Sequence, residues 1–336
     1  MSICSRDPLP TSALAGVVAI AALLLAGGRV DAQGGGRGAA QEPENVLAGV
    51  IDLHHHQEPD ERPRNMDIID ASLYARLRGM RGAVFKSHSN QTATTTWLAA
   101  KMVPNFLPIP VIDLNLVHGG LNRYAVENFA TLVRKPQNPA PDIGIVMMPS
   151  DTSCYQRQVE KSNAACVAIS KDGRLLPETI EIIALVKKFG LVLASGHASP
   201  DDCVLLAREA QRQGVPFTVT HINLNTTPPM LDLAHAQEVA KLGGYLEFAS
   251  QSQRPGNPTL EQRNTRTADL IRKLGPQYAI LETDLGQVDN EPAPDGLAAF
   301  IMNLRAKGFT KAETDMMTKI NPAKLLGLPL PAGATP

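Results

Sequence analysis

The sequence predicts one α/β domain in which eight parallel strands alternate with helices and close into a (β/α)8 barrel, the TIM-barrel architecture. From residue 45 onward, eight short apolar or β-branched runs alternate with helical patterns of ten to fifteen residues, and eight is the number of strands that closes such a barrel. The runs are almost continuously apolar, as expected of strands buried on both faces. An open doubly wound sheet is the alternative, but the first run is not followed by the Gly-x-Gly-x-x-Gly motif of the dinucleotide-binding version.

The segment before this domain has the features of an export signal. Arg6 precedes an uncharged apolar run at 13–28, and small residues follow at the positions that a signal peptidase recognises. The run is shorter than the ~20 residues that a membrane-spanning helix needs, so a cleaved signal peptide over 1–32 is favoured over an uncleaved anchor. Residues 33–44 are rich in glycine and form a flexible linker. We therefore expect an exported protein, periplasmic or secreted and without stable membrane insertion, whose barrel spans 45–330.

Strands and helices are expected in strict alternation along the barrel. The strands are expected at residues 50–53, 82–85, 108–114, 143–148, 191–194, 216–220, 244–248 and 278–282. The helices are expected at residues 67–79, 92–101, 122–134, 177–189, 200–213, 230–242 and 260–274. The helix at 200–213 has the clearest ends, because Ser199 is a favourable N-cap residue, Pro200 suits the first turn and Gly214 can end the helix.

Composition restricts the classes of partner. The 336 residues carry a formal net charge of −1 and contain no basic run, so neither a nucleic-acid backbone nor an anionic membrane surface is expected as the main partner. Aromatic residues make up only 4% of the chain, which also argues against a stacking platform for single-stranded nucleic acid. The expected partner is a small-molecule substrate, and the sequence is compatible with an oligomer.

Histidines gather where the predicted strands end. Seven of the eight histidines follow such a run, and three of them are consecutive after the first strand. Side chains alternate across a strand, so His54 and His56 point to one side and His55 points to the other. Neutral imidazole is the commonest metal ligand in proteins, and the active site of a (β/α)8 barrel lies where its strands end. His54 and His56 are therefore candidate metal ligands, whereas His55 is expected to be structural.

Later strands end in further potential ligands. The fifth strand is followed by His197, the sixth by His221 and the eighth by Asp284. Each of these residues alone is more simply explained as a polar group at a strand end, but together with the first pair they favour one common metal site. His118 and His235 are interpreted as structural.

The chain order of these residues resembles that of the amidohydrolase superfamily of metal-dependent hydrolases. Members carry His-x-His on strand one, His on strands five and six, and Asp on strand eight. The resemblance covers roughly residues 45–328, including a closing segment at 321–328 and a stretch at 79–88 that is similar to an uncharacterised branch of the superfamily. It implies a divalent metal, zinc by default and one or two ions, bound by His54, His56, His197, His221 and Asp284.

The fourth predicted strand lacks the ligand that bridges two metals in many members of the superfamily. Many members with two metals use a carbamylated lysine or a glutamate on strand four, and the fourth predicted strand supplies neither. Lys86 and His88, after the second strand, are candidates to replace it, and with Asp284 they are the candidate catalytic residues. Alternatively, Lys86 contacts the substrate as an ordinary cation or pairs with Asp52.

Three further residues are candidates for substrate binding. Arg64 follows the first strand and could pair with a substrate carboxylate or phosphate, although a surface ion pair is the simpler interpretation. Asn115 and Asn122 follow the third strand, the latter after two glycines that permit close backbone approach. The loop at 149–176 is too long for a plain connector and is expected to form a lid or wall.

The cysteines fit an oxidising compartment. Cys154 and Cys166 are close enough in sequence to close a short loop as a disulfide, and Cys203 would then be a buried free thiol. The alternative is that all three are free. No Cys-x-x-Cys spacing is present, which excludes a thiolate zinc site of that kind.

These features together predict a metal-dependent hydrolase. A metal-bound hydroxide would attack an amide, cyclic amide, ester or lactone, and Asp284 would accept the proton of the water. A non-hydrolytic lyase, such as a decarboxylase, could use the same barrel and metal. A metal- or solute-binding protein without turnover is the third possibility, since fold does not fix function.

Overall fold

The computed structural model describes residues 44–135, 139, 142–250 and 259–332. Contacts within the chain divide it into two units, Met1–Glu44 and Asn45–Pro336. The expected signal peptide and nearly all of the expected linker lie outside the described residues. Within the described ranges, no helix is both long and apolar enough to cross a membrane.

The second unit is built around eight parallel strands that form a nearly closed barrel. Neighbouring strands follow the order β1-β2-β3-β4-β7-β8-β9-β10. Their bounds are β1 Ile51–His56, β2 Gly82–Lys86, β3 Leu107–Asp113, β4 Ile145–Met147, β7 Val192–Ala194, β8 Phe217–Val219, β9 Tyr245–Ala249 and β10 Ala279–Glu282. The seam closes where the backbone N–H of Asp284 donates to the carbonyl of His54 at 2.9 Å and that of His56 donates to the carbonyl of Leu285 at 2.8 Å. The (β/α)8 prediction is confirmed.

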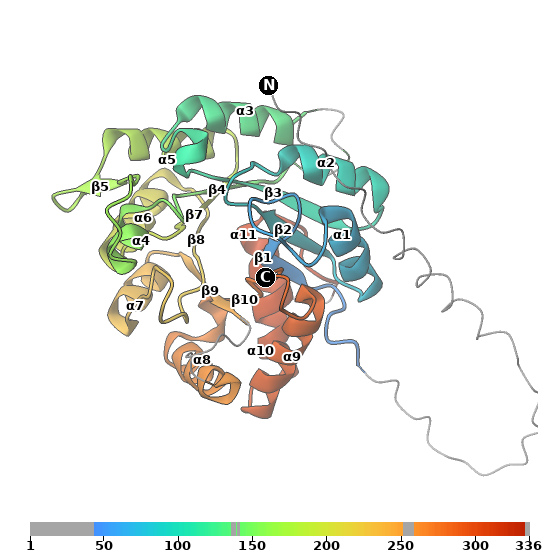
Figure 1. Cartoon of the computed structure of the whole chain (residues 1–336). Helices are drawn as coiled ribbons and strands as arrows, with labels where there is room; N and C mark the ends of the chain where they lie inside the picture. The colour runs from blue at the N-terminus through green and yellow to red at the C-terminus, as the bar shows by residue number, and fades with distance from the viewer. Residues whose placement is uncertain (1–43, 136–138, 140–141, 251–258, 333–336) are drawn as a thin grey trace, which may run out of the picture. The chain divides into compact units, whose positions relative to one another are not determined.

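Helices surround the strands, as Figure 1 shows for the second unit. The helices that follow strands in the barrel are α1 Ile68–Leu77, α2 Ala93–Met102, α3 Arg123–Val133, α5 Pro177–Lys188, α6 Pro200–Gln213, α7 Leu233–Lys241, α8 Leu260–Leu274 and α9 Ala293–Ala306. The last elements in the described residues are α10 Lys311–Asp315, a π-helical turn η3 Met316–Ile320 and α11 Asn321–Leu325. Short 3₁₀ turns occur at η1 Leu116–His118 and η2 Pro276–Tyr278.

Local sequence signals account for the element ends. In α6 the Ser199 hydroxyl accepts a hydrogen bond from the Asp202 backbone N–H at 3.1 Å, Pro200 occupies the first turn, and Gly214 ends the helix with φ of 67°. This is the predicted arrangement, because a glycine adopts the left-handed conformation without steric cost.

The predicted elements differ from the structure in two regions. The 149–176 segment contains a short helix α4 Cys154–Val159 and a hairpin of β5 Ser170–Lys171 and β6 Arg174–Leu175. The second region is the stretch after β10, where α9 and α10 were not predicted. Pro292, Pro294 and Gly296 cluster at the start of α9 and are typical of a loop in the sequence. Helix α10 has only five residues, too few for a periodic pattern.

Two apolar clusters hold the barrel together. One combines strand residues such as Ile51, Val84 and Ile109 with Leu325 at the end of α11 and Leu326 just after it. The other joins the opposite strand faces to the helices. Alternation of side chains along each strand separates the two clusters, so the strands are buried on both faces, as their apolar composition predicts.

Candidate metal centre

A cavity of about 480 Å³ lies at the carboxyl ends of the strands. Its lining includes predicted site residues from five strand ends: His56, Lys86, His88, His197, His221 and Asp284. These residues are far apart in sequence and meet because the carboxyl ends of parallel strands share one rim of the barrel.

The end of β1 and the residue after β10 form the tightest group in this region. The Oδ1 atom of Asp284 lies 3.1 Å from Nε2 of His56 and 3.6 Å from Nε2 of His54. One ligand atom from each of the three residues falls within 4.8 Å of the others. A shift in the β1–β2 register between Asp52 and His55 accompanies this arrangement. The group has the donor types and spacing that a divalent cation requires.

His197 and His221 extend this group across the cavity. The ring of His221 is centred 5.5 Å from that of His54 and 5.1 Å from that of His197. His221 and Asp284 both have positive φ, 29° and 52°. Non-glycine residues rarely adopt this conformation, and it concentrates at functional sites. All five predicted metal ligands are therefore brought together.

The four imidazoles are held in the neutral form. Burial lowers the pKa of His54, His56 and His197 well below the usual histidine value, and the positive charge of Lys86 acts in the same direction on His54. Burial also lowers the pKa of His221 to about 4. Neutral imidazole is the form that binds a metal.

Several buried nitrogens of this group have no hydrogen-bond partner in the described structure. They are Nδ1 and Nε2 of His54, Nδ1 of His56 and Nδ1 of His221. Buried polar atoms are nearly always paired with protein groups, water or an ion. The donor set thus fits a metal ion, in agreement with the sequence prediction.

Lys86 and His88 lie on the β2 side of the cavity. The side chain of Lys86 is 1% exposed, and its Nζ lies 3.7 Å from Oδ2 of Asp113. His88 contacts the same carboxylate at 3.6 Å and pairs with the Ser150 hydroxyl at 3.1 Å. Asp52, which the sequence suggested as a partner of Lys86, instead accepts hydrogen bonds from Thr283 and from the His54 backbone.

Arg64 lines the cavity but is not a surface residue. Its side chain is 3% exposed and donates through two nitrogens to the carboxylate of Asp60. Burial would raise the pKa of Asp60, but the Arg64 guanidinium and a hydrogen bond from Ser87 more than offset this and lower it. The surface ion pair expected from the sequence is in fact a buried one.

Asn115 and Asn122 support backbone instead of lining the cavity. The Asn115 amide donates to the His88 carbonyl at 3.1 Å and accepts from the backbone N–H groups of Ser150 and Thr152. Asn122 caps the start of α3 by accepting from two backbone N–H groups. Neither residue belongs to the cavity lining, and their hydrogen bonds within the protein account for both.

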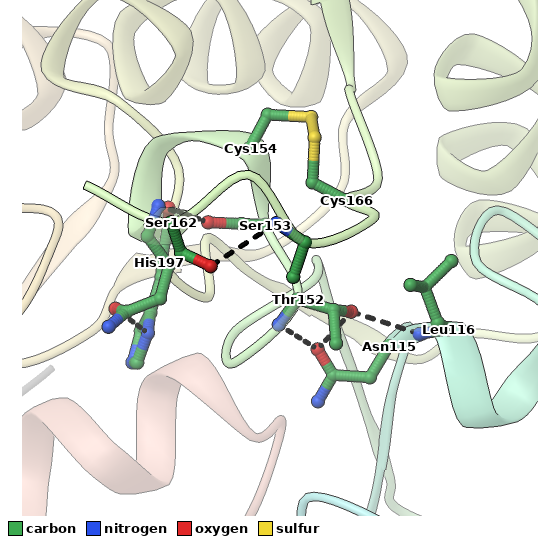
Figure 2. The surroundings of a disulfide bond; sticks show 10 residues. Asn115, Leu116, Thr152, Ser153, Cys154, Ser162, Cys166 and His197 are labelled. Atoms are coloured by element: carbon green, nitrogen blue, oxygen red, sulfur yellow. Dashed lines mark hydrogen bonds between the residues drawn. A yellow bond between two sulfur atoms is a disulfide. The ribbon is translucent and has the colours of Figure 1, made fainter. Parts of the chain in front are cut away.

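A disulfide-linked segment forms the wall beside His197. Cys154 and Cys166 are joined, and Cys203 is a buried free thiol in α6. Figure 2 shows the disulfide next to Ser153, whose hydroxyl donates to the His197 carbonyl at 2.7 Å. The disulfide therefore lies in the segment that contacts His197, a predicted metal ligand.

Gln156 on α4 was not recognised in the sequence. Its Oε1 lies 2.8 Å from Nδ1 of His197, and its Nε2 donates to Glu160 at 2.6 Å. Because the amide N–H₂ of Gln156 faces a carboxylate, its oxygen faces His197 and accepts the Nδ1 proton. This leaves Nε2 of His197 as the unprotonated nitrogen that can bind metal. Local sequence gives no signal for this contact, which depends on how the loop folds.

A group of buried carboxyls lies beneath the histidines. Oε2 of Glu282 is 3.5 Å from Nδ1 of His54. Burial raises the pKa of Glu282 well above its usual value, and the neighbouring Glu247 carboxyl acts in the same direction. Burial also raises the pKa of Glu247 and of Asp52 to about 7. Glu282 is absent from the cavity lining, whereas Asp284 belongs to it.

The remaining histidines have structural surroundings. His55 is buried against Phe85, with ring centres 5.2 Å apart. His118 donates from Nδ1 to the Asp113 carbonyl at 2.7 Å. His235 lies at the start of α7 and contacts Asp232 and Asp201 at 2.8 and 3.2 Å. These positions agree with the sequence interpretation of all three.

Several solved structures have the same fold. An amidohydrolase from Pseudomonas aeruginosa matches with a TM-score of 0.55 and 14% identity, covering 84% of this chain and 96% of that one. A putative 2-pyrone-4,6-dicarboxylic acid hydrolase from Pseudomonas putida matches with a TM-score of 0.54, 13% identity and coverages of 84% and 99%. A 2,6-dihydroxybenzoate decarboxylase from Rhizobium matches with a TM-score of 0.53, 12% identity and the same coverages of 84% and 99%.

These similarities confirm the predicted resemblance to the amidohydrolase superfamily at the level of the fold. Comparison with curated proteins gives no match. A family model described as "Family of unknown function (DUF6282)" matches residues 49–247, more than half of the chain. The chain therefore belongs to the DUF6282 family.

Proposed function

We propose that this protein is an exported metal-dependent hydrolase that cleaves an amide, cyclic amide, ester or lactone. The observation that carries the proposal is the cluster of His54, His56 and Asp284, with the rings of His221 and His197 following at centre distances of 5.5 and 5.1 Å beside the same cavity. The imidazole-rich donor set suits zinc, with one or two ions. The Cys154–Cys166 disulfide supports export, because disulfides persist in oxidising compartments.

The residues have separate roles in this proposal. His54, His56, His197, His221 and Asp284 would hold the metal. When bound, the metal supplies Lewis acidity and lowers the pKa of water toward neutrality. Asp284 lies against two of the histidines and also lines the cavity, so its carboxylate is suited to accept the proton of the attacking water and pass it to the leaving group. Glu282 is buried beneath His54 and is suited to orient that ring.

Hydrolysis is tested with the metal-loaded protein and a panel of amides, esters and lactones in water enriched in oxygen-18. The proposal expects a carboxylic acid product that has gained one labelled oxygen. Release of carbon dioxide without label uptake would instead identify a lyase, a reaction class that also occurs among structures of this fold. Metal binding without turnover of any panel member would favour a binding protein.

A further inference from the structure

Among the described lysines and arginines that line the cavity, only Lys86 makes no hydrogen bond to an acidic partner. Arg62 pairs with Asp151, and Arg64 pairs with Asp60. Lys86 has no hydrogen-bond partner, although its side chain is only 1% exposed and lines the cavity. A buried ammonium is costly to desolvate unless an anion and hydrogen-bond acceptors receive it.

Asp113 meets this requirement only in part. Its Oδ2 lies 3.7 Å from the Lys86 Nζ, which is too long for a hydrogen bond, and it already accepts a hydrogen bond from Ser150. The carboxylate therefore balances the charge of Lys86 without using its three N–H donors. Those donors have no acceptor in the described structure, and Lys86 lines the cavity.

We propose that Lys86 is the anion-binding residue of the substrate pocket and that it receives a carboxylate carried by the substrate. A single ammonium matches a monoanion, whereas a phosphate dianion would need the arginines that are already paired. This inference rests on the proposed function and narrows its substrate to small carboxylic acids with the hydrolysable bond beside the metal ligands. The cavity of about 480 Å³ fits a molecule of that size.

The bridging carbamate considered from the sequence would conflict with these surroundings. Addition of carbon dioxide to the Lys86 amine would replace a cation with an anion beside the buried carboxylate of Asp113. Two negative charges this close in a buried site repel each other, which makes the charged carbamate unfavourable.

The test measures binding of simple carboxylates to chelator-treated, metal-free protein by calorimetry, with acetate, benzoate and glutarate as probes and benzamide as the neutral control. Wild-type protein is expected to bind at least one carboxylate more tightly than benzamide. Lys86→Met should weaken that binding about 10-fold or more, and Lys86→Arg should largely retain it. Because no metal is present, the result stands even if the protein proves to have no metal or no hydrolase activity.

Two further measurements control for loss of folding and for carbamate formation at Lys86. Lys86→Met leaves the buried Asp113 carboxylate without its ammonium partner, which destabilises the fold. The double variant Lys86→Met/Asp113→Asn is therefore measured alongside it, with thermal melting as the check of folding. Carbon-13-labelled bicarbonate is then added to wild-type protein with and without zinc, and the carbamate region is recorded by NMR. Equal carboxylate binding by wild type and the methionine variants, no binding of any probe, or a carbamate signal that the variants lack would overturn the proposal.

Discussion

Replacing Gln156 with leucine is expected to weaken metal binding through His197. Leucine has a similar size but cannot accept the Nδ1 proton of His197, a contact of 2.8 Å in the structure. Loss of one such hydrogen bond costs about 1 kcal/mol, and the freed ring can also adopt the tautomer that presents a proton to the metal. Loss of a hydrogen-bond partner that orients a metal-binding histidine lowers metal affinity about 10–100-fold, equivalent to about 1.4–2.7 kcal/mol.

The assay is competition for zinc against a chromophoric chelator at fixed pH, with circular dichroism melting to check the fold. Gln158→Leu is the matched control, since Gln158 is an exposed residue of the same helix. It should bind zinc like the wild type. A zinc affinity of Gln156→Leu within about twofold of the wild type, or an equal loss in Gln158→Leu, would refute the assigned role of Gln156.

Three other predictions concern catalysis, the loop and pH. Asp284→Asn should retain the fold and lose about 10²–10⁴ in kcat; near wild-type turnover together with an inactive Glu282→Gln would transfer the proton-accepting role to Glu282. Changing both Cys154 and Cys166 to serine should lower the free energy of unfolding by about 2–4 kcal/mol, measured by urea denaturation, and unchanged stability would contradict a structural disulfide. The carboxylate of Asp232 raises the pKa of His235, so this histidine stabilises the fold below about pH 6.5 and the stabilisation is lost as pH rises through the folded-state pKa. His235→Gln should therefore cost about 0.5 kcal/mol at pH 5 and less at pH 9, and an equal cost at both pH values would contradict this.

The gathering of the candidate metal ligands could be predicted because its signals are local. An apolar run that ends in His54-His55-His56 reports both the strand and the alternation of its side chains, and the structure has His54 and His56 beside Asp284 and His55 against Phe85. Barrel topology then brings strand ends together wherever they lie in sequence. The fold and the gathering of the five predicted ligands follow from these two facts.

The surroundings of the ligands could not be predicted in the same way. Gln156 reaches His197 from a loop helix, and Asp113 reaches Lys86 from the next strand. Such contacts depend on side-chain directions and loop conformation, which periodicity does not encode. Asn115 shows the same dependence, since its position after a strand predicts substrate contact, whereas in the structure its amide binds neighbouring backbone.

The central claim is tested most directly by the divalent metal content of the purified protein, measured by plasma mass spectrometry after extensive dialysis. Wild-type protein should carry at least one ion per chain. The double variant His54→Ala/His56→Ala should carry none and melt at a lower temperature, because an ion that binds only the native state stabilises it. His235→Ala, which changes a histidine outside the cavity, should keep the wild-type content. Equal metal content in wild type and the double variant, or a metal-free wild type that does not bind added zinc, would contradict the assignment of this site.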